Sequence, residues 1–280
     1  MKTTGSAHRA RKRFGQHFLE PAWVDKVLRA IAPASDQAFI EIGAGRGAMT
    51  RALTARARRV VAFEIDRDLA AALRQTAPTN LTVVEGDFLD VTPETLQSVL
   101  TAGELAQPIR VAGNLPYNVA SPILFKLVDL RAAGIRLADA HVMLQREVAD
   151  RLVATPGTGE YGVLTVLIGH VAGVERVLAL PAGAFRPAPK VQSAVVRLQF
   201  HPPNPPVKDG RIFVDLVRAV FTRRRKTLAN ALLAFERKRV GAFAGPKRLA
   251  GIDGRRRPET LSIAEFARLA DAIAEMTLPA

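Results

Sequence analysis

Five short apolar runs, each followed by a stretch of helical composition, constrain the fold of this 280-residue chain more than any other feature. The runs cover residues 38–42, 60–63, 81–84, 109–112 and 141–144. Helices are expected to begin after them, near Gly47, Arg67, Pro93, Ala120 and Arg146. Apolar runs of this length are typical of buried strands, and their alternation with helices is typical of a parallel sheet covered on both faces. We therefore expect an α/β fold.

The pattern changes after the fifth run. Residues 163–172, 174–180 and 191–200 are rich in residues that favour strands, and no stretch between them is long enough for a helical crossover, which predicts an antiparallel edge. The prolines of residues 202–206 predict a stiff linker, because proline continues neither a sheet ladder nor a helix interior. The remainder has helical periodicity. We expect one domain over residues 1–204 and a smaller helical domain over residues 205–280.

Composition narrows the class of protein. A hydrophobic content of 48% over this length can bury one large core and a smaller second lobe. The chain has no cysteine, which excludes disulfides, thiolate zinc sites and cysteine nucleophiles and fits a reducing compartment. The apolar stretch at residues 163–174 is too short to cross a membrane, and the basic N-terminus lacks an apolar signal core. We expect a cytoplasmic monomer that holds no metal and does not bind membranes.

Positive charge gathers at the two ends of the chain. Residues 1–13 hold five Lys and Arg and no acid, and residues 205–280 hold 16 basic and eight acidic residues, so the ends carry 13 of the 14 excess charges. Such ends attract polyanions through salt-sensitive phosphate contacts. Solubility alone is the alternative explanation. Membrane binding is disfavoured because the Arg clusters lack a one-sided aromatic face.

Glycines and acids follow successive apolar runs. The loop that contains Gly43 and Gly45 lets the backbone turn tightly and approach a ligand. The spacing of its glycines also satisfies the dinucleotide fingerprint. Glu64, at the end of the second run, could accept both hydroxyls of a ribose. Asp87, after the third, could accept from an adenine amino group or simply cap the next helix. Since the carboxyl ends of parallel strands share one edge, we expect these residues and Asn114 to line one crevice.

The Asn-Leu-Pro-Tyr sequence at residues 114–117 can hold an amino group on an aromatic ring. The side-chain oxygen of Asn114 and a carbonyl near Pro116 could both accept from that nitrogen and aim its lone pair at an electrophile. Tyr117 offers a flat face for a base, and such stacking contributes about 1–3 kcal/mol per base. An ordinary turn capped by asparagine is the alternative.

Five segments match, in order, the motifs of one family. They are residues 14–19 (Phe-Gly-Gln-His-Phe-Leu), 41–47 (Glu-Ile-Gly-Ala-Gly-Arg-Gly), 114–117, 185–193 (Phe-Arg-Pro-Ala-Pro-Lys-Val-Gln-Ser) and 224–232 (Arg-Arg-Lys-Thr-Leu-Ala-Asn-Ala-Leu). The chain thereby resembles the ribosomal RNA adenine N6,N6-dimethyltransferases from residue 12 to about residue 275. The resemblance implies a seven-stranded, Rossmann-like S-adenosylmethionine-dependent methyltransferase domain followed by a small helical domain.

The same resemblance separates two branches of the family. The Arg-Arg-Lys-Thr-Leu segment and Tyr-Gly-Val-Leu-Thr at residues 161–165 favour the bacterial small-subunit branch. That branch dimethylates two adjacent adenosines in a loop near the 3′ end of 16S rRNA during small-subunit biogenesis. The erythromycin-resistance branch, which methylates 23S rRNA, is the alternative. Direct in-line transfer to N6 without a strong general base is the expected mechanism, on a base unstacked from the RNA.

Site residues carry over from these motifs by position. The residues implied to bind the cofactor are His17, Leu19, Gly43, Gly45, Glu64, Asp87 and Asn114. The residues implied at the target base are Asn114, Pro116, Tyr117 and Phe185, with Phe185 across the base from Tyr117. The residues expected to bind RNA phosphates are Arg11, Lys12, Arg13, Arg223, Arg224, Arg225 and Lys226. Many family members have Asn in place of His17, so a surface role for His17 stays open, as does a core role for Phe185.

Three other classes of function remain at this stage. A nicotinamide oxidoreductase would explain the glycine loop and Glu64 but has no use for residues 114–117 or the basic ends. A DNA adenine methyltransferase would use a related tetrapeptide. A non-catalytic ribosome-assembly factor would use the basic surface alone, and that role can coexist with methyl transfer to immature small subunits.

Overall fold

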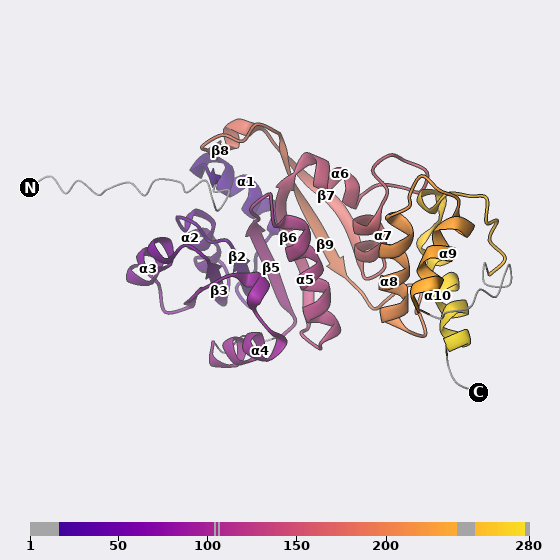
Figure 1. Ribbon diagram of the computed structural model, residues 1–280. Coiled ribbons are helices and arrows are strands. Elements are labelled where there is room, and N and C mark those ends of the chain that lie inside the picture. Colours follow the sequence, from indigo (N-terminus) through magenta and orange to yellow (C-terminus); the bar gives the residue numbers. More distant parts are fainter. Residues whose placement is uncertain (1–16, 104, 106, 240–249, 278–280) are drawn as a thin grey trace, which may run out of the picture. The chain divides into compact units, whose positions relative to one another are not determined.

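The computed structural model describes residues 17–103, 105, 107–239 and 250–277, and it divides into two compact units (Figure 1). The first unit contains the described residues up to Ala149 together with Glu175–Gln199. The second contains Asp150–Val174 and the described residues from Phe200 onward. The sequence placed a single boundary at residue 205, whereas the structure groups residues 150–174 with the C-terminal helices.

One mixed sheet forms the centre of the first unit. Its strands are β2 (Ala38–Ile42), β3 (Arg59–Glu64), β4 (Leu81–Glu85), β5 (Ile109–Asn114), β6 (Leu137–Gln145), β7 (Ala172–Leu180) and β9 (Ser193–Phe200). They lie in the order β4-β3-β2-β5-β6-β9-β7. The first five strands in this order, β4, β3, β2, β5 and β6, pair in parallel with their neighbours. Strand β9 pairs antiparallel with β6. The five predicted strands and the antiparallel edge are confirmed.

Helices follow the parallel strands where the sequence predicted them. They are α2 (Ala48–Thr54), α3 (Arg67–Gln75), α4 (Pro93–Ala102), α5 (Ala120–Ala132) and α6 (Arg146–Leu152). Local chemistry sets their starts: the Asp66 carboxylate accepts from the backbone N–H of Asp68 at α3, and Thr92 accepts from that of Thr95 at α4. Other elements of this unit were not predicted. Helix α1 (Pro21–Ile31) precedes the sheet, and strand β1 (Phe18–Leu19) pairs with β8 (Phe185–Arg186).

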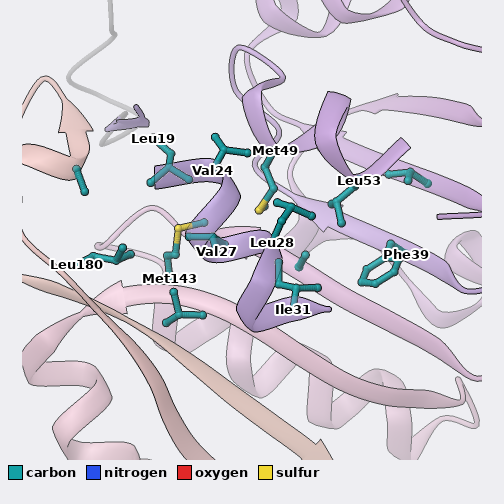
Figure 2. Close-up of a cluster of buried hydrophobic side chains, with 14 of the residues drawn as sticks. Leu19, Val24, Val27, Leu28, Ile31, Phe39, Met49, Leu53, Met143 and Leu180 are labelled. Atoms are coloured by element: carbon teal, nitrogen blue, oxygen red, sulfur yellow. The ribbon is translucent and has the colours of Figure 1, made fainter. Parts of the chain in front are cut away.

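Helices α1 and α2 cover one face of the sheet through a shared apolar cluster (Figure 2). Helix α1 contributes Val24, Val27, Leu28 and Ile31, which share one helical face. Met49 and Leu53 of α2 and Phe39 and Val60 of the sheet complete its centre. On the opposite face, Phe88 of a short 3-10 helix, η2 (Phe88–Asp90), packs edge-on against Phe63 with ring centroids 5.1 Å apart, and α5 contacts η2. This packing fixes the strand ends that carry the site.

The second unit is built around helix α8 (Gly210–Phe221). Helices α7 (Val163–Gly169), α9 (Leu228–Arg239) and α10 (Ile263–Thr277) contact α8, and a short 3-10 helix, η5 (Pro258–Thr260), lies before α10. The prediction of a strand over residues 163–172 is wrong for its first part. That apolar run is buried on all sides, and a fully buried segment has no periodicity to distinguish a helix from a strand.

The proline-rich segment at residues 202–206 is held against the end of α7. The backbone N–H of Asn204 donates to the carbonyl of His170 at 2.8 Å, and Nε2 of His170 lies 2.7 Å from the carbonyl of Pro205. The segment is therefore fixed to the helical unit by hydrogen bonds. Among the described residues, no helix has the length and apolarity needed to cross a membrane.

Candidate active site

The site lies where the order of the parallel strands reverses. Strand β2 lies between β3 and β5, so the connections from β2 and β5 leave the sheet in opposite directions. At such a switch point the strand ends open a crevice. The loop beginning at Gly43 follows β2, Asn114 ends β5, and Ile42 pairs with Gly113 just before them. The predicted meeting of these two segments is observed.

The glycine loop brings bare backbone to the crevice. Gly43 and Gly45 have φ of +75° and +58°, a region that favours glycine. A Cβ on Gly43 would lie 3.3 Å from the carbonyl oxygen of Asn114, so a side chain there would crowd the end of β5. The backbone N–H of Gly45 donates to Oε2 of Glu64 at 2.6 Å. A ligand in the crevice can therefore lie directly against main chain.

Glu64 is fixed at the end of β3. Its side chain is buried, and Oε1 accepts from the backbone N–H of Asp66 at 2.9 Å while Oε2 accepts from Gly45. Burial raises the pKa of Glu64, and these backbone hydrogen bonds lower it. Each oxygen retains a further lone pair, so Glu64 is an oriented acceptor for ligand hydroxyls.

Asn114 is oriented by the segment that precedes β1. Its side-chain Nδ2 donates to the carbonyl oxygen of His17 at 2.6 Å, and Oδ1 has no partner among the described residues. The carbonyl of Pro116 already accepts from the N–H of Val119 at 3.1 Å. The carbonyl of Leu115 accepts no hydrogen bond in the part of the chain that the structure describes. Two acceptors, Oδ1 of Asn114 and the carbonyl of Leu115, are therefore available together.

Tyr117 is held by contacts at both ends of its side chain. Its hydroxyl lies 2.7 Å from Oγ of Ser193, and the ring of His17 stacks on its ring with centroids 5.3 Å apart and planes at 23°. Nδ1 of His17 in turn lies 2.7 Å from the carbonyl of Pro187. Burial raises the pKa of Tyr117, against the Ser193 hydrogen bond that lowers it. Nothing in the sequence indicated the His17–Tyr117 stack, and Ser193 appeared only as the last residue of a motif.

Most of the predicted site residues line three pockets that share lining residues. One pocket is lined by seven of them, His17, Gly43, Gly45, Glu64, Asn114, Pro116 and Tyr117. A second pocket contains Asp87 and shares Gly43 and Pro116 with the first. A third contains Leu19 and shares Gly43, Gly45 and Asn114. Phe18 and Ile65, which the sequence analysis did not single out, also line the first pocket.

Asp87 has the capping role considered for it from the sequence, and it keeps an oxygen that could serve the other role. Its Oδ1 accepts from the backbone N–H of Leu89 at 2.9 Å and so caps η2. Its other oxygen has no hydrogen bond to any described residue, and the residue lines the second pocket. One oxygen is structural and the other is available to a ligand.

Phe185 does not lie where the sequence placed it. The residue is 2% exposed, pairs with Leu19 between β8 and β1, and belongs to the apolar cluster beneath α1. It lines none of the three pockets that contain the other site residues. The pairing of β8 with β1 draws its ring into the core, so we correct its expected position opposite Tyr117.

Glu41 is a site-proximal residue that the sequence analysis did not single out. It is 1% exposed at the end of β2, lines the third pocket, and its Oε2 has no hydrogen-bond partner among the described residues. Burial raises the pKa of Glu41 to about 8. The carboxyl is therefore protonated at neutral pH.

The predicted phosphate-binding residues fall into two groups. Arg223, Arg224, Arg225 and Lys226 lie in the turn between α8 and α9 and line a hollow in the second unit together with Glu259. Arg11, Lys12 and Arg13 lie outside the described residues.

The fold and the site define a class of protein: an α/β domain of the S-adenosylmethionine-dependent methyltransferase type, with a glycine loop, a strand-end acid and an Asn-Leu-Pro-Tyr turn at the switch point. The family model for ribosomal RNA adenine dimethylase matches residues 7–275. The chain belongs to that family.

Relatives of known name agree with this family assignment. Two relatives named ribosomal RNA small subunit methyltransferase A are similar over nearly their whole length. The protein from Chromohalobacter salexigens is 43% identical, with 98% of this chain and 95% of the relative covered. That from Salmonella typhimurium is 41% identical, with 96% and 94% covered.

Two crystal structures share the fold. A dimethyladenosine transferase from Plasmodium falciparum has a TM-score of 0.72 at 24% identity and covers 90% of this chain and 96% of its own. The 23S rRNA methyltransferase ErmE has a TM-score of 0.61 at 27% identity and covers 92% and 99%.

Proposed function

We propose that this protein transfers methyl groups from S-adenosylmethionine to N6 of two adjacent adenosines in a loop near the 3′ end of 16S rRNA, giving N6,N6-dimethyladenosines during small-subunit biogenesis. The observation that carries the proposal is the pair of unpartnered acceptors at the end of β5, which lie beside the glycine loop of β2. The near full-length similarity to proteins named ribosomal RNA small subunit methyltransferase A supports the choice of RNA.

The residues of the crevice fit S-adenosylmethionine. The backbone at Gly43 and Gly45 can lie against its methionine part, the oriented carboxylate of Glu64 can accept from its ribose, and the available oxygen of Asp87 can accept from its adenine. His17 borders the first pocket and Leu19 borders the third. When bound, S-adenosylmethionine supplies a methyl group attached to a positively charged sulfur, and this sulfur is a good leaving group.

Asn114 and Leu115 orient the target amine. The exocyclic nitrogen of adenine is a poor nucleophile while its lone pair is conjugated with the ring. Hydrogen bonds from its two N–H groups to Oδ1 of Asn114 and the carbonyl of Leu115 hold the lone pair out of conjugation with the ring and direct it at the methyl group. Pro116 shapes this turn, and Tyr117 supports the base by stacking. The contribution of the protein is position and electrostatics.

The proton and the second methyl group place few further demands on the site. Once the nitrogen has four bonds it is strongly acidic, so it releases its proton to water or a carbonyl without a dedicated base. The monomethylated amine retains one N–H, which either acceptor can hold for the second transfer. Two methyl groups on each of two adenosines require four such transfers, each with the base unstacked into the pocket.

We also propose that two parts of the chain have different roles. The methyltransferase domain spans residues 1–204, although residues 150–174 within it group with the C-terminal helices, and residues 205–280 form a helical RNA-binding domain. Arg223, Arg225 and Lys226 supply affinity for RNA phosphates rather than choice of base, and residues 11–13 add to this from the N-terminal arm. The protein acts as a cytoplasmic monomer on the immature small subunit.

One other function has a specific observation in its favour. The structural similarity to ErmE raises methylation of 23S rRNA as the alternative. Purified protein is incubated with labelled S-adenosylmethionine and with unmodified small and large subunits in separate reactions, and the labelled rRNA is mapped by mass. We expect dimethyladenosine in 16S rRNA alone. Label confined to 23S rRNA would establish the alternative, and label in neither would contradict both.

A further inference from the structure

Four consecutive basic residues lie in the turn between α8 and α9, and one of them differs from the other three. The side chain of Arg224 is 36% exposed and forms an ion pair with Glu259 through Nε. Its Nη2 donates to the carbonyls of Gly159 at 2.7 Å and Thr158 at 3.3 Å. The guanidinium of Arg224 is therefore bound to one carboxylate and two main-chain carbonyl oxygens of the protein itself.

The neighbours of Arg224 have no such contacts. Arg223, Arg225 and Lys226 are exposed, and their side chains form no ion pair or hydrogen bond within the described part of the chain. They line the same hollow as Glu259. An acid in a basic hollow repels phosphate unless its charge is neutralised, and Arg224 neutralises Glu259.

Arg224 joins three segments that are distant in sequence. Glu259 is bound to the loop before α7 through its main chain as well, because its carbonyl accepts from the N–H of Gly157 at 2.7 Å. The end of the basic turn is bound to the segment before η5, where the N–H of Leu228 donates to the carbonyl of Arg256 at 2.7 Å. The turn, the loop at residues 157–159 and the segment at residues 256–259 therefore form one closed hydrogen-bonded unit, which we call the clasp.

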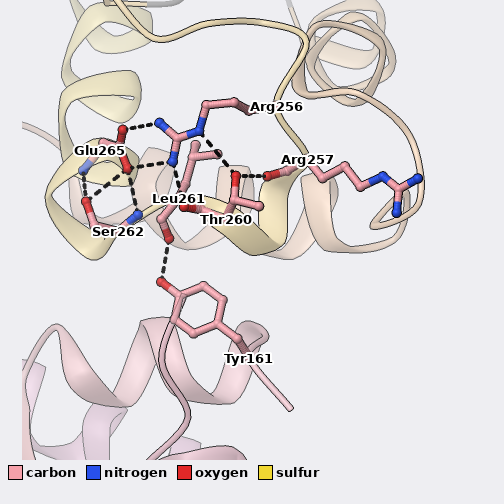
Figure 3. A network of polar contacts seen from close by, with 7 residues as sticks. All are labelled: Tyr161, Arg256, Arg257, Thr260, Leu261, Ser262 and Glu265. Carbon is pink, nitrogen blue, oxygen red and sulfur yellow. Dashed lines mark hydrogen bonds and ion pairs between the residues drawn. The ribbon is translucent and has the colours of Figure 1, made fainter. Parts of the chain in front are cut away.

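A second network of polar contacts involves the residues on either side of η5 (Figure 3). Arg256 forms an ion pair with Glu265 and donates to the carbonyl of Thr260 at 2.6 Å. The hydroxyl of buried Tyr161 donates to the carbonyl of Leu261 at 2.7 Å. The pKa of Glu265 is lowered by its hydrogen bond with Arg256. The segment that carries Glu259 is thus also fixed by contacts that do not involve Arg224.

We infer that Arg224 is a positioning residue, which holds the turn so that Arg223, Arg225 and Lys226 present their charges to RNA phosphates, and that its own guanidinium does not bind RNA. The inference rests on the proposed function and concerns how that function holds its substrate. A planar fork that bonds a carboxylate and two carbonyls is available to arginine and not to lysine. Charge at position 224 is therefore not sufficient.

Replacing Glu259 gives outcomes of opposite sign. If Arg224 positions the turn, Glu259→Gln loosens the clasp and weakens binding of a full-length 16S rRNA transcript several-fold. If all four basic residues simply attract phosphate, removing an acid from their hollow strengthens binding. Glu160→Gln is the matched control, because Glu160 is exposed and has no side-chain partner among the described residues. It is expected to leave binding unchanged or strengthen it slightly.

Charge-preserving variants test Arg224 itself. Arg224→Lys is expected to weaken RNA binding several-fold and to lower its salt dependence, because the three neighbours lose phosphate contacts, whereas Arg225→Lys should stay within about twofold of the wild type. Arg225→Ala should lower the slope of log affinity against log salt by about one. Because the partners act as a pair, Arg224→Lys combined with Glu259→Gln should weaken binding no more than either change alone. Thermal unfolding of each variant separates loss of the fold from loss of the clasp.

Two results would overturn the inference. One is RNA binding by Glu259→Gln as tight as that of the wild type or tighter. The other is RNA binding by Arg224→Lys within about twofold of the wild type, since charge alone would then be sufficient at position 224. The proposed function fails separately: wild-type protein that transfers no methyl group to rRNA contradicts that function, whatever the binding variants do.

Discussion

The side-chain amide of Asn114 donates a 2.6 Å hydrogen bond to the main-chain carbonyl of His17, although 97 residues separate the two along the chain. The contact joins the end of β5 to the segment that enters β1. It consumes an N–H of the amide, so that Oδ1 is the atom left to a ligand in the pocket that both residues line. The side chain is therefore oriented before any substrate binds.

This orientation predicts the effect of replacing Asn114. Asn114→Ala removes both the hydrogen bond to His17 and the acceptor for the amine, and should slow single-turnover methyl transfer by about 100-fold or more. Asn114→Asp should be similarly slow, because a carboxylate facing the His17 carbonyl has no proton to donate. Transfer is followed with labelled S-adenosylmethionine, and RNA binding should change little. Asn230→Ala, in the helical unit, is the control. Retention of transfer by Asn114→Ala would remove the amide from the mechanism.

Tyr117 allows its ring and its hydroxyl to be tested separately. Tyr117→Phe loses the hydrogen bond to Ser193 and keeps the ring, so transfer should fall less than about tenfold. Tyr117→Ala also loses stacking of about 1–3 kcal/mol and should fall about 10- to 100-fold. Ser193→Ala should match Tyr117→Phe. Equal losses in Tyr117→Phe and Tyr117→Ala would show that the hydroxyl, not the ring, supports the base.

Phe185 provides a test of the corrected position. If its ring belongs to the core, Phe185→Leu keeps most of the buried volume, lowers the free energy of unfolding by about 1 kcal/mol and leaves transfer near the wild-type rate. Phe185→Ala should cost about 3–5 kcal/mol. Urea unfolding gives the stability of each variant. A large loss of methyl transfer in a stably folded Phe185→Leu variant would instead indicate that the ring contacts the target base.

The strands and the glycine loop could be predicted because their causes are local. A buried strand needs an apolar run, and the turn after Ile42 needs glycine at positive φ. Phe185 and α7 could not be predicted, because each is decided by partners elsewhere in the chain. The ring of Phe185 is buried by the pairing of β8 with β1, and the apolar run of α7 would suit a strand equally well. The contacts of Asn114 with His17 and of Arg224 with Glu259 leave no trace in sequence spacing for the same reason.

Glu41 should make stability depend on pH. Its carboxyl has a pKa of about 8 in the folded chain and an ordinary value of 4.5 when unfolded. Between these values the unfolded chain loses the proton and the folded chain keeps it. The free energy of unfolding therefore falls as pH rises from 4.5 to 8, by about 1.4 kcal/mol per pH unit.

Glu41→Gln isolates this effect because it keeps the shape and removes the titration. Urea unfolding of both proteins at several pH values gives the difference in stability. We expect the free energy of unfolding of the variant to rise steadily relative to that of the wild type between pH 5 and pH 8. Above about pH 8 the difference should stay constant. A difference that is constant with pH would mean that Glu41 is ionised in the folded chain.

His141 should have the opposite dependence. It is 3% exposed in β6, its Nδ1 has no hydrogen bond to any described residue, and burial lowers its pKa to about 4 from an ordinary 6.5, against the attraction of Asp139. Between these values the unfolded chain binds a proton that the folded chain does not. Stability is therefore fully present above pH 6.5 and is lost as pH falls toward 4, by about 1.4 kcal/mol per unit.

His141→Gln removes the titration and so tests this dependence. The difference in unfolding free energy between variant and wild type should be constant from pH 7 to pH 8, where both chains are neutral at this position. Below pH 6.5 the wild type should lose stability relative to the variant until about pH 4. If the difference instead stays constant down to pH 4, His141 accepts its proton in the folded chain. Asp139, whose Oδ2 lies 3.7 Å from Nδ1, would then be the group that holds it.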